Sequence, residues 1–120
     1  MDIALLQQRL RTFAAERSWD PYLTPKNLAM ALVVEAAELG EIFQWKTPEE
    51  SMALDEATRV HLGEEISDVL MYLLQIADRS GVDVAQAVER KIRLNALKYP
   101  VPPAPAGSSS VDSKGPAAHL

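Results

Sequence analysis

The 120-residue sequence contains no cysteine and only two histidines, His61 and His119. The absence of cysteine excludes disulfides, thiolate nucleophiles and cysteine-based zinc sites. Two histidines, one of them next to the last residue, are too few for a histidine-rich metal site. Any metal that this chain binds must therefore be held by oxygen ligands.

Basic residues and long apolar runs are also scarce. The chain has 12 Lys and Arg against 17 Asp and Glu, for a net charge of −5. This balance disfavours nucleic-acid binding, which relies on clustered basic side chains, but it allows a nucleotide whose phosphates are neutralised by a metal. Charges interrupt every apolar run and the N-terminus lacks a signal-peptide pattern, so we expect a cytoplasmic protein without a membrane-spanning helix.

Helical spacing dominates the sequence, and no strand pattern is convincing. Nearly half of the residues are hydrophobic, which is enough for one small domain that gains from self-association. Start signals stand at Thr24, Thr47 and Asp83, with a stop signal at Gly81. The pattern predicts a short helix or turn after Thr47 and four long helices, at residues 2–18, 26–45, 56–79 and 84–98.

The composition changes at residue 101. Residues 101–120 are rich in Pro, Gly and Ser and contain the run Ser108-Ser109-Ser110. Such a segment cannot bury enough apolar surface to fold. We therefore predict one domain at residues 1–100, followed by a disordered tail at 101–120.

Two acidic pairs stand out, Glu35 with Glu38 and Glu65 with Asp68. Each pair has i, i+3 spacing and so shares one helix face. Glu35 falls within an apolar stripe, where an ionised carboxylate is costly unless it is paired. If the two long helices pack antiparallel, the four carboxylates converge, and a hard divalent cation such as Mg²⁺ or Mn²⁺ would offset their repulsion.

A simpler interpretation of the acidic pairs also exists. Charged residues at this spacing are common on solvated helix faces, where they bind nothing. From the residue types alone, the metal site and the solvated face are about equally favoured.

The order of these motifs resembles the ExxE…ExxD pattern of the all-α nucleoside triphosphate pyrophosphohydrolases, the MazG-like proteins. The flanking segments are similar to the dCTP pyrophosphatase branch of that superfamily. The likeness spans about residues 3–100 and rests mainly on the segments 35–38 (EAAE), 43–46 (FQWK), 65–68 (EISD) and 91–100 (KIRLNALKYP). It implies an oligomeric four-helix bundle, a dimer or a dimer of dimers, with substrate sites at subunit interfaces.

The resemblance also assigns roles to individual residues. Four catalytic carboxylates would ligate Mg²⁺, or alternatively Mn²⁺: Glu35, Glu38, Glu65 and Asp68. Among them, Glu38 would also orient or deprotonate the attacking water. The phosphate-binding residues would be Lys91, Asn95, Lys98 and Tyr72, and the base-binding residues would be Trp19 and Trp45. A solvated helix end and core-edge aromatic side chains are the alternatives for these two groups.

The implied reaction is Mg²⁺-dependent hydrolysis of a deoxynucleoside triphosphate to the monophosphate and pyrophosphate, as in nucleotide-pool sanitation. The implied substrate is dCTP or a modified dCTP. Some members of that branch carry a histidine near the base where this chain has Leu10, so dUTP or another non-standard nucleotide stays open. A non-catalytic helical interaction module is the alternative from a different class.

Overall fold

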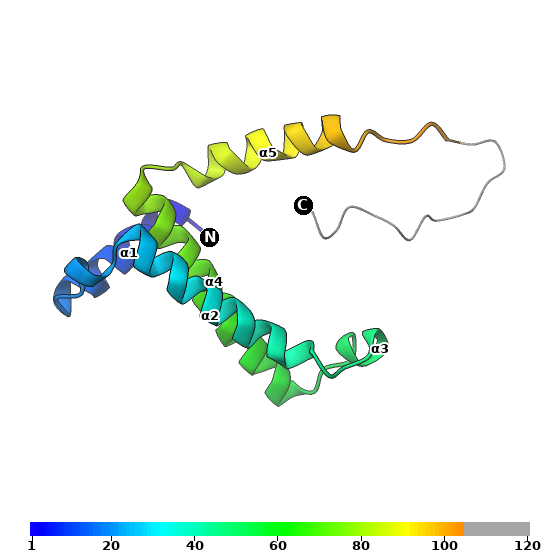
Figure 1. Ribbon diagram of the computed structural model, residues 1–120, viewed down its shortest axis with the longest axis horizontal. Helices are drawn as coiled ribbons and strands as arrows, with labels where there is room; N and C mark the ends of the chain where they lie inside the picture. Colours follow the sequence, from blue (N-terminus) through cyan, green and yellow to red (C-terminus); the bar gives the residue numbers. More distant parts are fainter. Residues whose placement is uncertain (105–120) are drawn as a thin grey trace. The chain divides into compact units, whose positions relative to one another are not determined.

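The computed structural model describes residues 1–104, and helices are the only regular elements within that range (Figure 1). The predicted all-α class is confirmed, and each predicted long helix is present with its ends within two residues of the predicted ones. The elements are α1 (Ile3–Glu16), the 3₁₀ turn η1 (Asp20–Tyr22), α2 (Pro25–Phe43), α3 (Pro48–Ser51), α4 (Glu56–Ser80) and α5 (Val84–Lys98).

Side-chain caps set the starts of the helices, as the sequence predicts. The Thr24 hydroxyl accepts a hydrogen bond from the Asn27 amide at 3.2 Å, and Pro25 occupies the first position of α2. Thr47 and Glu50 form a reciprocal capping box at α3. These caps satisfy amide groups that have no partner inside a helix, so they fix where each helix begins.

The chain divides into two compact units, Met1–Val82 and the part from Asp83 onward. In the first unit α2 runs antiparallel beside α4, and α1 packs more sparsely against α4 (Figure 1). The second unit contains α5, followed at residues 101–104 by a segment without helix. The predicted tail at 101–120 lies mostly outside the described residues, and the domain boundary at residue 100 stays a prediction.

Ion pairs attach the first helix and its following turn to the end of α4. Arg11 lies 2.6 Å from Asp78, and Arg79 reaches the Asp20 carboxylate in η1 at 2.7 Å. Both pairs join residues about sixty positions apart in the sequence. The C-terminal end of α4 therefore anchors both α1 and the turn η1 that follows it.

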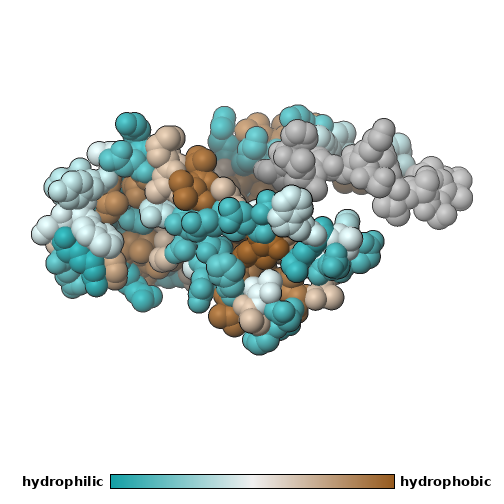
Figure 2. All heavy atoms as spheres, turned by 60° about the horizontal axis from the view of Figure 1, so that its bottom comes forward, coloured by the Kyte–Doolittle hydropathy of each residue, from teal (hydrophilic) through white to brown (hydrophobic). Residues whose placement is uncertain are grey.

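Few apolar side chains are buried in the described part of the chain. The buried apolar residues are Ala14, Leu28, Leu74 and Ala77, whereas Met30, Val33 and Val34 on α2 are all exposed. Figure 2 shows apolar side chains at the surface among polar ones. None of the described helices is both long enough and apolar enough to span a bilayer. Exposed apolar side chains that lie together are typical of a surface that another protein molecule covers.

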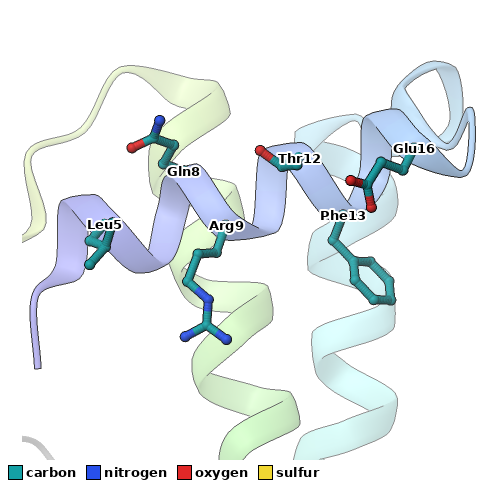
Figure 3. Close-up of a pocket in the computed structure, with 6 residues that line it drawn as sticks. All are labelled: Leu5, Gln8, Arg9, Thr12, Phe13 and Glu16. Atoms are coloured by element: carbon teal, nitrogen blue, oxygen red, sulfur yellow. The ribbon is translucent and has the colours of Figure 1, made fainter.

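The two sides of α1 differ in character. Figure 3 shows Arg9 and Phe13 projecting from the same side of the helix, whereas Gln8 points away from that side. Phe13 meets Trp19 edge to face, with ring centroids 5.7 Å apart. Trp19 therefore packs on the side of α1 that bears Arg9 and Phe13.

A left-handed turn at Ser18 ends α1 and sets the direction of the chain into Trp19. Ser18 has φ of 57°, and the Trp19 amide donates to the Ala14 carbonyl at 2.9 Å. Gly81, with φ of 69°, ends α4 in a similar way. At Ser18 the Cβ atom makes this conformation costly, whereas glycine adopts it freely.

Replacing Ser18 by glycine should therefore stabilise the fold. We expect Ser18→Gly to raise the free energy of unfolding by about 1 kcal/mol, because the strain at positive φ is removed. Urea denaturation followed by circular dichroism measures this difference. Ser18→Ala is the matched control, since alanine keeps the Cβ atom, and an equal gain in both variants would contradict the explanation.

Candidate metal and nucleotide site

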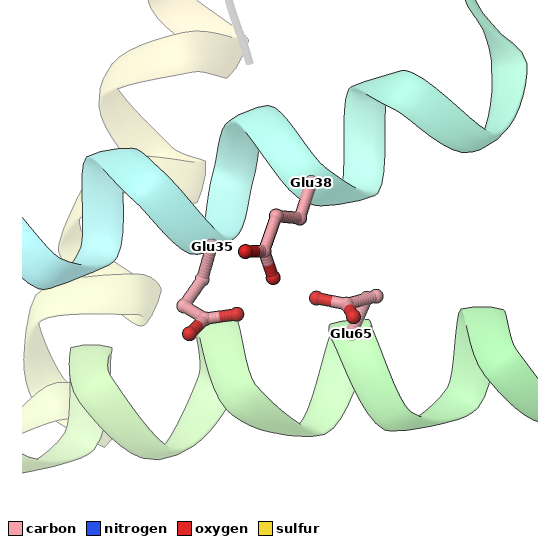
Figure 4. A group of neighbouring side chains, drawn as sticks. All are labelled: Glu35, Glu38 and Glu65. Carbon is pink, nitrogen blue, oxygen red and sulfur yellow. The ribbon is translucent and has the colours of Figure 1, made fainter.

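Three carboxylates from two antiparallel helices converge in the first unit. Glu35 and Glu38 come from successive turns of α2, and Glu65 comes from the facing surface of α4 (Figure 4). One carboxylate oxygen of each residue lies within 4.8 Å of the corresponding oxygens of the other two. The sequence predicts that four carboxylates converge, and this group contains three of them, without Asp68.

The cluster contains buried oxygen atoms that lack partners. Glu65 is only 8% exposed, and its Oε2 atom and the Oε2 atom of Glu35 are buried without a hydrogen bond among the described residues. Buried acceptors without partners are costly. A hard cation would satisfy both oxygens at once, so this donor set fits a divalent metal such as Mg²⁺.

The raised pKa of Glu35 also favours a bound cation. Its pKa is raised from 4.5 to about 7, first by burial and then by hydrogen bonding to Glu38 and the charges of Glu38 and Asp68. A carboxyl group whose ionisation is resisted in this way keeps its proton to much higher pH than an ordinary glutamate, unless a cation replaces the proton. The carboxyl groups therefore favour either a shared proton or a bound metal ion.

Asp68 and Tyr72 lie on α4 beyond this three-residue group. Asp68 follows Glu65 by three residues on the same face of α4, and its charge contributes to the raised pKa of Glu35. Burial, followed by the charges of Glu35 and Asp68, raises the pKa of the Tyr72 phenol. Asp68 therefore adjoins the carboxylate cluster, and Tyr72 faces the same negative charges.

A cavity of about 410 Å³ lies between α1 and α4, next to Asp68 and Tyr72. Trp19, which is 47% exposed, forms part of its wall together with Phe13. Five further side chains that line it are those of Leu6, Arg9, Leu10, Met71 and Gln75. The cavity therefore joins an acidic end to an aromatic and apolar wall.

One predicted contact residue of the first unit does not line this cavity, and three others belong to the second unit. Trp45 is 90% exposed and does not line this cavity. Lys91, Asn95 and Lys98 lie on α5 in the second unit, where Lys91 and Asn95 share one helix face. Their roles in binding base and phosphate therefore stay predictions.

Two polar neighbours of the site were not singled out by the sequence analysis. His61 Nδ1 lies 3.9 Å from Glu65 Oε1, and His61 lines a second hollow together with Glu38 and Lys46. Gln75 lines the cavity between α1 and α4. Their spacing from the acidic motif, i−4 from Glu65 and i+7 from Asp68, was the available signal, because both spacings keep residues on one helix face.

A family model described as the MazG-like family matches residues 30–110 of the chain. The chain is 48% identical over 91 residues to dCTP pyrophosphatase 1 of Bos taurus and 47% identical over 90 residues to that of Homo sapiens. These matches cover 74% and 73% of this chain but 54% and 53% of the relatives. The chain therefore spans about half the length of these curated relatives.

A solved structure agrees with this relationship. The crystal structure of a pyrophosphatase from Archaeoglobus fulgidus superposes with a TM-score of 0.77 at 42% sequence identity. The match covers 82% of this chain and 92% of that one. The similarity thus extends over nearly the whole archaeal chain, in contrast to the longer mammalian relatives.

The raised pKa of Glu35 predicts how stability depends on pH. The unfolded chain binds this proton with a pKa near 4.5 and the folded protein with a pKa of about 7. The stabilising contribution of the proton is therefore complete below pH 4.5 and is lost as the pH rises to about 7. We expect the Tm of EDTA-treated protein to fall across this interval, and the fall to be smaller in Glu35→Gln.

Differential scanning fluorimetry in a series of buffers measures this dependence. Glu41→Gln is the matched control, because Glu41 is an exposed carboxylate on the same helix. The explanation fails if Glu35→Gln and wild type lose the same Tm between pH 4.5 and pH 7.

Proposed function

The chain belongs to the MazG-like family, and we propose that it is a metal-dependent nucleoside triphosphate pyrophosphohydrolase. Its substrate would be dCTP or a modified dCTP, converted to the monophosphate and pyrophosphate in nucleotide-pool sanitation. The observation that carries the proposal is the carboxylate cluster of Glu35, Glu38 and Glu65, with two buried oxygens that lack partners. The names of the similar mammalian and archaeal proteins support the reaction class.

In the proposed site, Glu35, Glu38, Glu65 and Asp68 hold Mg²⁺, and the same oxygen donors accept Mn²⁺. When bound, the ion neutralises phosphate oxygens and polarises the attacked phosphorus. The raised pKa of Glu35 supports this assignment, because a cation would compensate both the burial that mainly raises it and the neighbouring negative charges.

Glu38 is our candidate for the residue that orients the attacking water and takes its proton. The water oxygen forms a bond to the α-phosphorus, and the bond from that phosphorus to the bridging oxygen of the β-phosphate breaks. The bonding electrons leave with pyrophosphate, and the nucleoside monophosphate remains.

The cavity between α1 and α4 is our candidate for the base-binding pocket. Trp19 supplies an aromatic face for stacking, and Tyr72 lies between this wall and the acidic end, where it can contact phosphate or sugar. Lys91, Asn95 and Lys98 are proposed to contact the triphosphate, with the lysines acting as point charges.

We propose that the protein works as a homo-oligomer, a dimer or a dimer of dimers. The exposed Met30, Val33 and Val34 form an i, i+3, i+4 stripe on α2 that a second copy would cover. A site shared between copies would also give a role to Trp45, which is fully accessible in the single chain.

Pyrophosphate release from a panel of deoxynucleoside triphosphates tests the reaction. We expect release with Mg²⁺ but not with EDTA, with dCTP or 5-methyl-dCTP leading the panel. Glu38→Ala should lower kcat by about 100-fold or more, because both a metal ligand and the base for water are lost. Glu49→Ala, a change at an exposed carboxylate in α3, should leave the rate unchanged.

Other outcomes separate the alternatives. Release led by dUTP or another non-standard nucleotide would keep the reaction and replace the substrate; the apolar Leu10 in the cavity wall is the observation that keeps this alternative open. No release from any nucleotide by folded protein would favour a non-catalytic interaction module.

Sedimentation equilibrium tests the oligomer. We expect wild type to sediment as a dimer or tetramer, and Val34→Glu to shift it toward the monomer, because a charge replaces an apolar contact. Lys26→Glu is the control, since it introduces the same side chain at an exposed polar position of α2. A monomeric wild type at micromolar concentration would contradict the proposal.

A further inference from the structure

Most of the wall of the cavity between α1 and α4 is apolar or aromatic. Leu6, Leu10, Phe13, Trp19 and Met71 all contribute to it. Such a wall holds a flat base by contact and stacking, but it discriminates weakly between bases of similar size. Strong discrimination needs a polar group that matches the hydrogen-bonding edge of one base and leaves the wrong base unpaired.

Gln75 is the lining residue placed to act in this way. Asp68, Tyr72 and Gln75 follow at i, i+4 and i+7 on one face of α4, and all three line the cavity. Gln75 lies about 10 Å along the helix axis from Asp68, toward the end of the cavity away from the carboxylates. This separation is comparable to that between the α-phosphate and the base edge of a nucleotide.

The amide of Gln75 retains a free acceptor and a free donor. Its Nε2 atom donates to the Met71 carbonyl at 3.1 Å, and the side chain is partly buried. Among the hydrogen bonds of residues 1–104 none uses Gln75 Oε1, and Nε2 carries a second hydrogen. Because the Met71 carbonyl can only accept, this bond also fixes which end of the amide is oxygen and which is nitrogen.

We infer that Gln75 reads the edge of the base and selects an amino-bearing pyrimidine, cytosine, over uracil and thymine. Its Oε1 accepts from the exocyclic amine, and the remaining N–H of Nε2 donates to the adjacent ring nitrogen. Glutamine reads an amine and a neighbouring ring nitrogen of adenine in DNA by the same pairing. In uracil and thymine a carbonyl replaces the amine, so Oε1 meets a second acceptor.

This inference rests on the proposed function, because it takes the cavity as the place of the base. If the cavity holds the base, α4 selects the base through Gln75. Leu10, on the α1 side of the cavity, offers no hydrogen bond. Because Gln75 would supply the hydrogen bonds to cytosine, a preference for cytosine does not require a polar residue at position 10.

The substitution Gln75→Met tests the inference, because methionine keeps the length and helix preference of glutamine but lacks its amide. Initial rates of pyrophosphate release give kcat/KM for dCTP and for dUTP. We expect wild type to prefer dCTP and the ratio of the two values to fall about tenfold or more in Gln75→Met. The fall should come from dCTP, with dUTP changed little.

A second measurement is independent of the chemical step. Calorimetric titration with dCMP and dUMP gives the Kd for dUMP divided by the Kd for dCMP, and this ratio should fall toward one in Gln75→Met. Gln8→Met is the matched control, because Gln8 points away from the side of α1 that bears Arg9 and Phe13 (Figure 3). If circular dichroism shows that Gln75→Met is unfolded, Gln75→Leu is measured in the same way.

The outcomes separate this inference from the function on which it rests. If wild type releases pyrophosphate but its cytosine-to-uracil ratio is near one, or is unchanged in the Gln75 variants, the inference is overturned and the proposed function stands. If wild type releases pyrophosphate from no nucleotide, the proposed function fails, and the monophosphate titrations alone decide whether Gln75 reads the base.

Discussion

Repulsion between carboxylates is the interaction on which the rest of this structure depends. The antiparallel packing of α2 against α4 brings Glu35, Glu38 and Glu65 together where two of their oxygens lack partners. Without a cation this arrangement opposes folding, and with one it becomes a crosslink between the two helices. The same three residues therefore affect how well the helices hold together and, in the proposed function, what the site binds.

Much of this arrangement could be predicted from the sequence, because it depends on local rules. Caps at Thr24, Thr47 and Asp83 set the helix starts, and the apolar spacing gave the four long helices. The approach of Glu65 to the pair of Glu35 and Glu38 could also be predicted, since i, i+3 spacing and antiparallel packing bring them to facing helix surfaces, whereas the position of Asp68 outside this group could not. That Glu35 interrupts an apolar stripe was the signal that separated this site from an ordinary charged surface.

Other features depend on contacts between distant segments, and the sequence does not show these. The cavity exists because α1 packs against α4, and the spacing of Gln75 from Asp68 places both on one face of α4 without showing that a pocket lies there. The same holds for the approach of His61 to the acidic cluster, since one histidine among helix residues is usually uninformative. Positive φ at Ser18 was equally hidden, because serine is not a residue that this conformation favours.

The sparse attachment of α1 has an evolutionary consequence. The helix contacts α4 less extensively than α2 does, and the ion pairs of Arg11 with Asp78 and of Arg79 with Asp20 include partly exposed side chains. The carboxylates lie on the other pair of helices, so substitutions in α1 can reshape the cavity without displacing them. The part of the cavity wall that α1 contributes and the carboxylates are thus carried by different helices, so descendants could change the shape of the cavity while they keep the acidic cluster.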